Sequence, residues 1–214
     1  MIKAVLFDID GTLINSLGNY LEAYTKTLNY YGFKLSNEEI VDRCFGHTEE
    51  AICEELGISQ KTEEFRDLYF NNVKKGLQKV KLFPDTIYTL GKLKREKAQV
   101  GFITFAKNWY VKEISDLFRL NQYAQLEIGF DDVINSKPNP EAVNKACKFF
   151  RIENNEALIV GDSKSDILMG KNAGSKTALY TPEENKIYYN FDELIKSNPN
   201  FIVKSLKDIL NLIT

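Results

Sequence analysis

The sequence is poor in cysteine, and the few cysteines it has are badly placed for cross-links. It contains three, Cys44, Cys53 and Cys147, which are widely separated and form no CxxC pair. An odd number at such spacing argues against both a disulfide framework and a zinc site. We therefore expect reduced, partly buried thiols and a fold held by its apolar core, for which 214 residues with 43% hydrophobic content suffice.

The sequence also lacks an excess of charge and any long apolar run. The 28 basic and 30 acidic residues give a formal net charge of -2, so no basic field attracts nucleic acid or anionic lipid. No run of about 18 apolar residues occurs, and the first residues lack the apolar core and cleavage site of a signal peptide. We expect a cytoplasmic protein, a monomer or weak homodimer, whose partner is a small molecule rather than nucleic acid or a membrane.

Short apolar and β-branched runs recur along the chain and alternate, in its second half, with segments of helical spacing. The predicted strands are Lys3–Phe7, Gln99–Thr104, Leu126–Phe130, Ala157–Val160, Lys176–Tyr180 and Phe201–Val203. The predicted helices between them are Trp109–Leu120, Pro140–Phe150 and Ser163–Asn172. This alternation implies parallel strands joined by right-handed crossovers. The expected fold class is α/β, with a Rossmann-like, doubly wound parallel sheet as the core.

The interval between the first two predicted strands is too long for one βαβ unit, which takes roughly 30 residues. Residues 16–82 have apolar positions at helical spacing, interrupted at Gly32, Gly46 and Gly57, and show no convincing strand. We predict an inserted α-helical domain at 16–82 and a core domain formed by 1–15 and 83–214. The aromatic residues of the insertion are predicted to form its own core rather than to stack on a ligand.

The first predicted strand ends in two carboxylates, in the stretch VLFDIDGTL. Asp8 and Asp10 are followed at once by Gly11 and Thr12. Ligands of open α/β sheets bind at the carboxyl ends of the strands, so both acids are expected at the binding edge. A structural explanation of this stretch alone is equally good, because Asp-Gly is a common turn and Asp a common helix N-cap.

A second pair of acids, Asp162 and Asp166, follows the predicted strand Ala157–Val160. Four carboxylates at neighbouring strand ends would repel one another by several kcal/mol unless a cation were present. Carboxylate and water ligands suit Mg²⁺. Thr104 and Lys137 add a hydroxyl and an ammonium group. Alone they are better explained as a strand end and a solvated loop cation, but with the metal they provide what a phosphoryl group needs.

Taken in order, these motifs resemble the haloacid dehalogenase superfamily, in its branch with a helical cap inserted after the first strand. The stretch DIDGTL from Asp8 is similar to the family's first motif, Thr104 to the second, Lys137 to the third, and GDSKSD from Gly161 to the fourth. The resemblance covers nearly the whole chain, although the insertion matches only in size and helical character. Within the family the chain looks like a phosphoglycolate phosphatase.

The resemblance implies a Mg²⁺-dependent phosphatase that hydrolyses a small phosphorylated metabolite through an aspartyl phosphate. Asp8 would be the nucleophile and Asp10 the acid and base. Thr104 and Lys137 would hold phosphate oxygens. The resemblance implies that the carboxylates of Asp8 and Asp162 and the main-chain carbonyl of Asp10 bind the metal. Asp166 would bind it directly or through water.

Substrate contacts are expected from two loops and from the turn of the first motif. The second motif departs from the family pattern. A small polar residue often follows the hydroxyl residue of this motif, but here Phe105 follows Thr104. In the helical insertion one loop resembles the substrate-facing loop of capped enzymes. Its Arg43 and His47 also have simple structural explanations: Arg43 could pair with a neighbouring Glu, and His47 could be a surface residue. The candidates are Gly11, Phe105, Ala106, Arg43 and His47.

Several other functions stay open. One is a sugar-phosphate mutase of the β-phosphoglucomutase type, although Glu49 and Tyr20 occupy positions where mutases of this branch carry Arg and His. A nucleotidase or a pyrophosphatase would use the same chemistry. Outside the enzymes, a phospho-Asp signalling module shares the acids but lacks the inserted domain and the DxDGT spacing. A catalytically silent binding domain is disfavoured by the retention of every motif residue.

Overall fold

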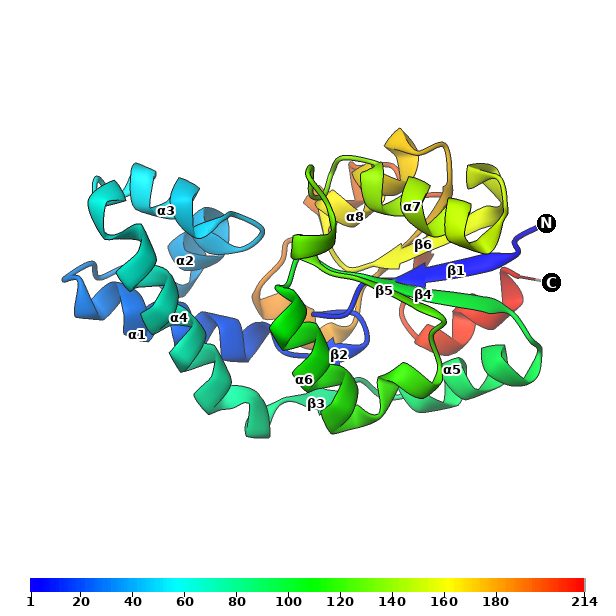
Figure 1. Cartoon of the computed structure of the whole chain (residues 1–214), viewed down its shortest axis with the longest axis horizontal. Coiled ribbons are helices and arrows are strands. Elements are labelled where there is room, and N and C mark those ends of the chain that lie inside the picture. Colours follow the sequence, from blue (N-terminus) through cyan, green and yellow to red (C-terminus); the bar gives the residue numbers. More distant parts are fainter. Residues whose placement is uncertain (214) are drawn as a thin grey trace. The chain divides into compact units, whose positions relative to one another are not determined.

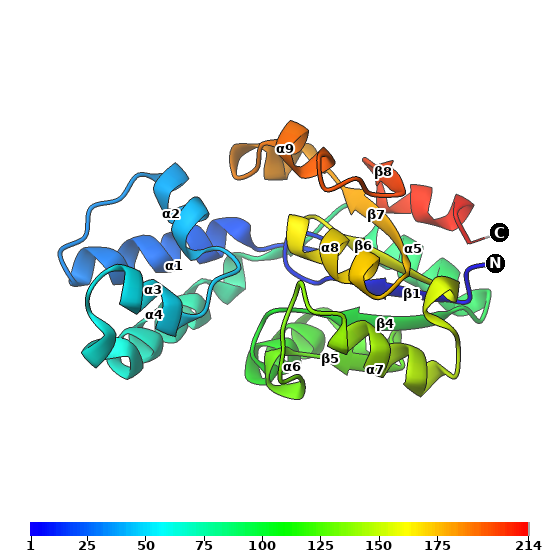
Figure 2. The same cartoon turned by 90° about the horizontal axis from the view of Figure 1, so that it is seen from above.

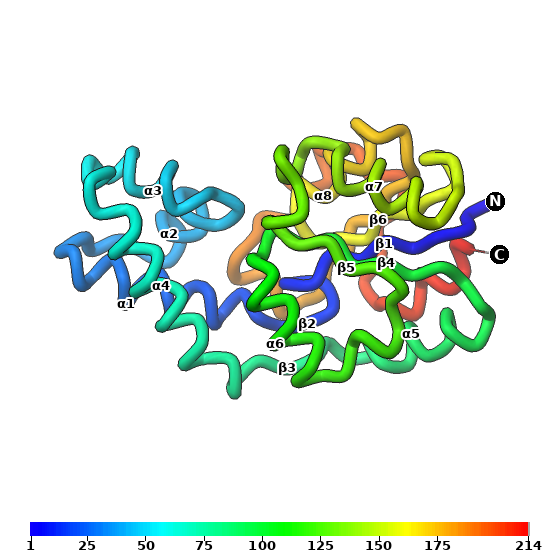
Figure 3. The backbone as a smooth tube through the Cα atoms, in the orientation of Figure 1, coloured from blue at the N-terminus to red at the C-terminus, as the bar shows by residue number. Residues whose placement is uncertain are grey.

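A computed structural model describes residues 1–213 of the chain. It divides into two compact units, Met1–Ile14 with Leu82–Thr214, and Asn15–Lys81. The two segments that connect them, β2 (Ile14–Asn15) and β3 (Lys81–Leu82), pair as a two-stranded sheet, which the backbone trace in Figure 3 lets the reader follow. Each unit is described separately below.

The first unit contains a six-stranded sheet in the order β5-β4-β1-β6-β7-β8, in which every neighbouring pair is parallel. Figure 2 shows this order across the sheet. The strands are β1 (Ala4–Phe7), β4 (Gln99–Ile103), β5 (Leu126–Ile128), β6 (Ala157–Gly161), β7 (Lys176–Tyr180) and β8 (Phe201–Val203). All six predicted strands and the predicted α/β class are confirmed. The predicted strand at 126–130 ends early because Phe130–Asp132 forms a 3₁₀ turn.

Helices cover both faces of this sheet (Figure 1). α7 (Glu141–Phe150) and α8 (Lys164–Asn172) lie on one face, and α5 (Thr86–Arg95) and α6 (Asn108–Phe118) lie on the other; the short α9 (Phe191–Ile195) follows β7. Strands covered on both sides need apolar residues without alternation, and every residue of β1 and β6 is buried. The predicted helices α6, α7 and α8 are confirmed to within about two residues of each end.

The second unit is all helical between Asn15 and Lys81. It contains α1 (Leu17–Tyr30), α2 (Asn37–Cys44), α3 (Glu49–Glu55) and α4 (Thr62–Gly76). Tyr24 of α1 stacks on Tyr69 of α4 with ring centroids 4.1 Å apart, and both rings are buried. The expected aromatic core of the insertion is therefore present.

The cysteines agree with the expectation of reduced thiols. All three are free and buried. Burial raises the pKa of Cys44 to about 12 and that of Cys147 to about 11, which makes both poor nucleophiles. Among residues 1–213, no helix combines the length and the apolar character that a membrane span requires.

Candidate active site

The loop after β1 brings the first motif to the carboxyl end of the sheet. Asp8 is buried, and its amide donates to the Val160 carbonyl of β6 at 2.8 Å. Gly11 has φ +81°, a conformation that glycine adopts with little strain, and its amide donates to the carbonyl of Ile14 at 2.8 Å. A Cβ at Gly11 would lie 2.1 Å from Oδ2 of Asp162, so the turn also requires glycine for space.

The loop after β6 supplies the other two buried acids. Asp162 directly follows the strand, and Asp166 lies in the first turn of α8, where its Oδ2 accepts the amide of Ser163 at 3.1 Å in a capping box. Asp8, Asp162 and Asp166 each offer a carboxylate oxygen, and these oxygens lie within 4.8 Å of one another. The adjacent parallel strands β1 and β6 thus place three acids at one point.

Lys137 lies within this acidic group. Its Nζ donates to Oδ1 of Asp8 at 2.5 Å, to Oδ1 of Asp166 at 2.6 Å and to the carbonyl of Ile103 at 2.8 Å. Its side chain is only 4% exposed, so it is not a solvated loop cation. Because an ammonium group has three protons, these three acceptors occupy all of them.

Burial dominates the electrostatics of the group. It raises the pKa of Asp8 to about 8, opposed by the charge of Lys137 and reinforced by the charges of Asp166 and Asp10. Burial and then the charges of Asp8 and Asp166 raise the pKa of Asp162 well above its usual range. Burial lowers the pKa of Lys137, but Asp166 and Asp8 more than offset it and leave that pKa above its ordinary value.

These residues fit a hard divalent cation. When all three carboxylates are ionised, the single ammonium group leaves two negative charges uncompensated in a buried place, and this cost is why burial raises the pKa values of Asp8 and Asp162. Oxygen donors from a few carboxylates are the set that Mg²⁺ prefers, and a cation there would favour the ionised form of each acid.

Asp10 occupies a different position. Its carboxylate is half-buried and is not one of the three mutually close acids; its Oδ1 accepts a hydrogen bond from the hydroxyl of Tyr110 at 2.7 Å. Tyr110 lies in α6 and is almost fully buried. Within one turn the first motif therefore separates one acid that faces the cluster from one that is held by a tyrosine.

Thr104 and the two residues after it lie in the loop that follows β4. Thr104 is buried, and its Oγ1 accepts the amide of Ala106 at 3.1 Å, which leaves the hydroxyl proton available for donation. The Phe105 ring meets that of Phe130 edge to face, with centroids 5.2 Å apart. In this structure the Ala106 amide is thus engaged within its own loop, and the Phe105 side chain packs inside the core unit.

The two candidate residues of the helical unit are exposed. Nε of Arg43 lies 3.5 Å from Oε1 of Glu55, which is the ion pair with a neighbouring Glu considered above. The amide of His47 donates to the carbonyl of Cys44 at 3.3 Å. Their contact with substrate stays a prediction.

Three residues that sequence analysis missed hold the acids in place. Oγ1 of Thr12 donates to Oδ1 of Asp162 at 2.8 Å. Nδ2 of Asn185 donates to the Gly11 carbonyl at 2.8 Å and to Oδ2 of Asp162 at 3.2 Å. Tyr110, described above, is the third. Thr12 belongs to the DxDGT motif and could have been found there, whereas Asn185 and Tyr110 belong to no motif.

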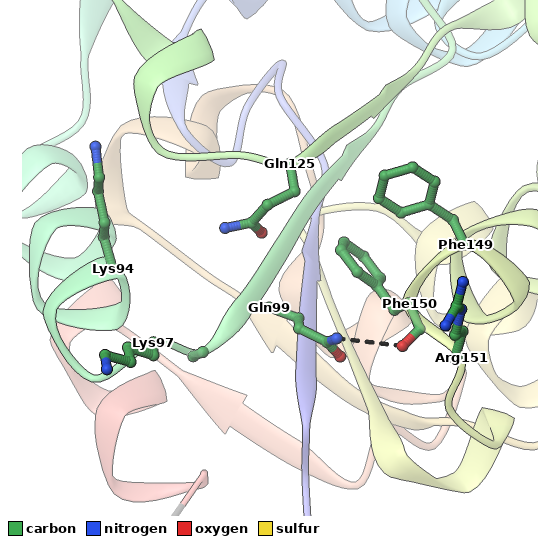
Figure 4. Close-up of a pocket in the computed structure, with 8 residues that line it drawn as sticks. Lys94, Lys97, Gln99, Gln125, Phe149, Phe150 and Arg151 are labelled. Atoms are coloured by element: carbon green, nitrogen blue, oxygen red, sulfur yellow. Dashed lines mark hydrogen bonds between the residues drawn. The ribbon is translucent and has the colours of Figure 1, made fainter.

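A separate pocket of about 650 Å³ lies elsewhere in the core unit (Figure 4). Figure 4 shows Gln99, at the amino end of β4, together with residues from the end of α7. Asp8 and Asp162 follow the carboxyl ends of β1 and β6, which run parallel to β4 in the same sheet. This pocket is therefore at the opposite edge of the sheet from the acidic group and is not the candidate active site.

Comparison with known proteins agrees with this geometry. The family model described as haloacid dehalogenase-like hydrolase matches residues 5–180, most of the chain and all four motifs. The chain belongs to the haloacid dehalogenase-like hydrolases. The family predicted from the sequence is thus confirmed, and relatives named phosphoglycolate phosphatase and pyrophosphatase confirm the predicted enzyme class, a phosphatase of this family.

Among curated members of the family, a phosphoglycolate phosphatase from Aquifex aeolicus is 30% identical over 204 residues, covering 95% of this chain and 96% of the relative. Pyrophosphatase PpaX from Bacillus cereus is 29% identical over 217 residues, covering 100% and 97%. A haloacid dehalogenase-like hydrolase from Streptococcus pneumoniae has a similar structure, with a TM-score of 0.84 and 20% identity over 100% and 99% of the two chains. At that identity the structural likeness shows the fold alone.

Proposed function

We propose that this hydrolase is a Mg²⁺-dependent phosphatase that cleaves a small phosphomonoester through an aspartyl phosphate on Asp8. The observation that carries the proposal is the buried group of Asp8, Asp162 and Asp166 around the Lys137 ammonium, at the carboxyl edge of the sheet. Relatives named phosphoglycolate phosphatase and pyrophosphatase support a phosphate ester or anhydride as substrate.

Asp8 and Asp162 would hold the cation with the main-chain carbonyl of Asp10, and Asp166 would do so directly or through water. When bound, Mg²⁺ supplies positive charge that keeps Asp8 ionised and offsets the charge of the phosphoryl group. Lys137 holds Oδ1 of Asp8 and so restricts rotation of the nucleophile. The Thr104 hydroxyl would donate its proton to a phosphate oxygen.

In the first step a carboxylate oxygen of Asp8 attacks phosphorus while the bond from phosphorus to the ester oxygen breaks. The departing oxygen takes the proton of Asp10, which acts as general acid. In the second step Asp10, now ionised, removes a proton from water as the water oxygen attacks phosphorus. The bond to Asp8 breaks, inorganic phosphate leaves and the carboxylate is regenerated. The hydrogen bond from Tyr110 orients Asp10 for both proton transfers.

We further propose that residues 16–82 act as a cap domain and that 1–15 with 83–214 form the catalytic domain. A cap that closes over a phosphoryl site excludes water during the first step. In this arrangement Arg43 and His47 are the cap residues from which substrate contacts are expected, with Gly11, Phe105 and Ala106 on the catalytic domain.

A phosphate-release screen of the full chain in Mg²⁺ tests the proposal, with phosphoglycolate, nucleoside monophosphates, sugar phosphates and pyrophosphate as substrates. Selective release from one of them identifies the substrate class. Isomerisation of a hexose phosphate that depends on a bisphosphate primer would instead indicate a mutase. A stable phosphoryl group on Asp8 without turnover would indicate a signalling module, and no hydrolysis of any compound would refute the phosphatase assignment and favour a binding domain.

A further inference from the structure

Asn185 is a fully buried polar residue that belongs to no family motif, and it lies in the 3₁₀ turn Glu183–Ile187 after β7. The segment after β7, which leads to α9, can be followed in Figure 2. Its own backbone closes the turn: its amide donates to the Pro182 carbonyl at 3.0 Å, and its carbonyl accepts the amides of Tyr188 at 2.9 Å and Tyr189 at 3.0 Å. The position of the side chain is therefore set by a closed local hydrogen-bond pattern.

The side-chain amide of Asn185 joins two loops of the candidate active site. Nδ2 donates one proton to the carbonyl of Gly11 at 2.8 Å and the other to Oδ2 of Asp162 at 3.2 Å. Because Thr12 donates to Oδ1 of the same carboxylate, both oxygens of Asp162 are held, from opposite loops. Each of them keeps a further lone pair for a cation.

The Oδ1 atom of Asn185 is buried and has no hydrogen-bond partner among the described residues. The orientation of the amide is well determined, because the reverse orientation would set an oxygen against two acceptors, the carbonyl of Gly11 and Oδ2 of Asp162. A buried acceptor without a partner is costly, so a donor is expected at this place. Water bound to a metal ion is such a donor, because its lone pair faces the ion and its protons face outward.

We infer that Asn185 is a positioning residue for the cation site, which fixes Asp162 and the Gly11 peptide through Nδ2 and accepts a hydrogen bond from a cation-bound water through Oδ1. The Gly11 peptide directly follows the Asp10 carbonyl, so holding it also holds a proposed metal ligand. Groups that orient metal ligands typically change metal affinity about 10- to 100-fold when removed. This inference rests on the proposed Mg²⁺ site, but it assigns a role to a residue outside the family motifs.

Mg²⁺ binding to the full chain, measured by titration calorimetry without substrate, tests the inference. Asn185→Leu keeps the number and branching of the side-chain heavy atoms and removes both donors and the acceptor, and we expect it to raise the Kd for Mg²⁺ by about tenfold or more. Asn185→Ser is too short to reach either acceptor, leaves room for water and should act in the same direction, so a folding failure of the first variant does not remove the test.

Asn190→Ala is the matched control. Asn190 lies in the same segment after β7, but its side chain caps α9 by accepting the amides of Asp192 and Glu193. We expect it to lower the melting temperature slightly and to leave the Kd for Mg²⁺ unchanged. Unchanged Kd in both Asn185 variants, or equal weakening by Asn190→Ala, would overturn the inference. Failure of the native chain to bind Mg²⁺ would overturn the proposed metal site itself. The experiment thus distinguishes failure of the metal site from failure of the role assigned to Asn185.

Discussion

Replacing Asp8 with Asn is expected to abolish turnover while stabilising the metal-free protein. The amide has nearly the same shape, but it cannot form an acyl phosphate. Loss of a covalent nucleophile predicts a fall in kcat of at least about 10⁴-fold, or roughly 5 kcal/mol of lost transition-state stabilisation. Lys137 keeps the Asp166 carboxylate and the Ile103 carbonyl as partners, so the variant leaves no unpaired buried cation.

The stabilisation follows from the raised pKa of Asp8. Burial lifts it from 3.8 to about 8, so between these values the folded chain keeps a proton that the unfolded chain releases. Because the native state binds more protons in this window, the free energy of unfolding falls as the pH rises from about 4 to about 8. At pH 7 the pH is about three units above the pKa of Asp8 in the unfolded chain, so this proton lowers the free energy of unfolding by roughly 4 kcal/mol. Asn carries no such penalty.

Denaturant unfolding in excess chelator, from about pH 5 to about pH 7.5, measures this difference. The variant should be more stable than the native chain by up to about 4 kcal/mol near pH 7, and the difference should shrink toward pH 5. Asp67→Asn, at an exposed position of α4, is the matched control and should give no such trend. This account of the buried acid would be refuted if the Asp8→Asn protein were less stable than the native chain near pH 7. It would also be refuted if the stability difference between the two proteins were the same at both ends of the pH range. Substantial residual turnover would remove Asp8 as the nucleophile.

Three further predictions follow from the contacts of the site. Gly11→Ala places a Cβ 2.1 Å from Oδ2 of Asp162, so it should weaken Mg²⁺ binding by about tenfold or more in calorimetry. Gly32→Ala, also at positive φ but with nothing within 4 Å of the added Cβ, should cost only about 1–2 kcal/mol of stability and leave Mg²⁺ binding intact. Equal Mg²⁺ affinities in the two variants would contradict the first prediction. Tyr110→Phe should lower kcat/KM, which reports the first step alone, by about tenfold or more for alkyl phosphates and much less for p-nitrophenyl phosphate, because in that step only a poor leaving group needs the proton of Asp10. Equal slowing of both esters would argue against this role. Finally, a chelator should silence the enzyme and Mg²⁺ but not Ca²⁺ should restore it, because Ca²⁺ takes more ligands at longer distances. Full turnover in excess chelator would remove the metal from the mechanism.

The sheet could be predicted because its strands carry a strong local signal. Strands covered on both faces are continuous apolar runs, as in β1 and β6, and the helices between them have clear apolar spacing. The segment after β7 could not be predicted in the same way. It folds as short 3₁₀ turns and the five-residue α9, and elements this short depend on tertiary contacts rather than on their own periodicity.

The same distinction applies to the site. Asp8 and Asp162 directly follow apolar strands, so predicting the strands is enough to place both acids at the carboxyl end of the sheet. Their proximity can therefore be predicted from the sequence. Asn185 and Tyr110 reach the site across 174 and 100 residues of sequence, from a turn and from the buried face of a helix. At the level of sequence a tyrosine at helical spacing is most simply a core residue, and an asparagine in a polar segment is most simply a turn residue. Their roles depend on where the fold delivers them.

The hydrogen bonds of the acids help to explain how the fold accommodates three buried carboxyl groups before any cation binds. Asp162 accepts from Thr12 and Asn185, Asp166 from Ser163 and Lys137, and Asp8 from Lys137. These donors come from four separate loops, so apart from the local bond between Ser163 and Asp166 the acids gain their partners only when these loops come together in the folded core unit. The raised pKa of Asp8 shows that the donors do not fully offset burial. A divalent cation that binds the native state alone would therefore also stabilise it, since any ligand selective for the folded chain shifts the unfolding equilibrium. Catalytic competence should thus saturate as Mg²⁺ is added, whereas the free energy of unfolding should begin to rise near the Kd for Mg²⁺ and then keep rising with the logarithm of the Mg²⁺ concentration.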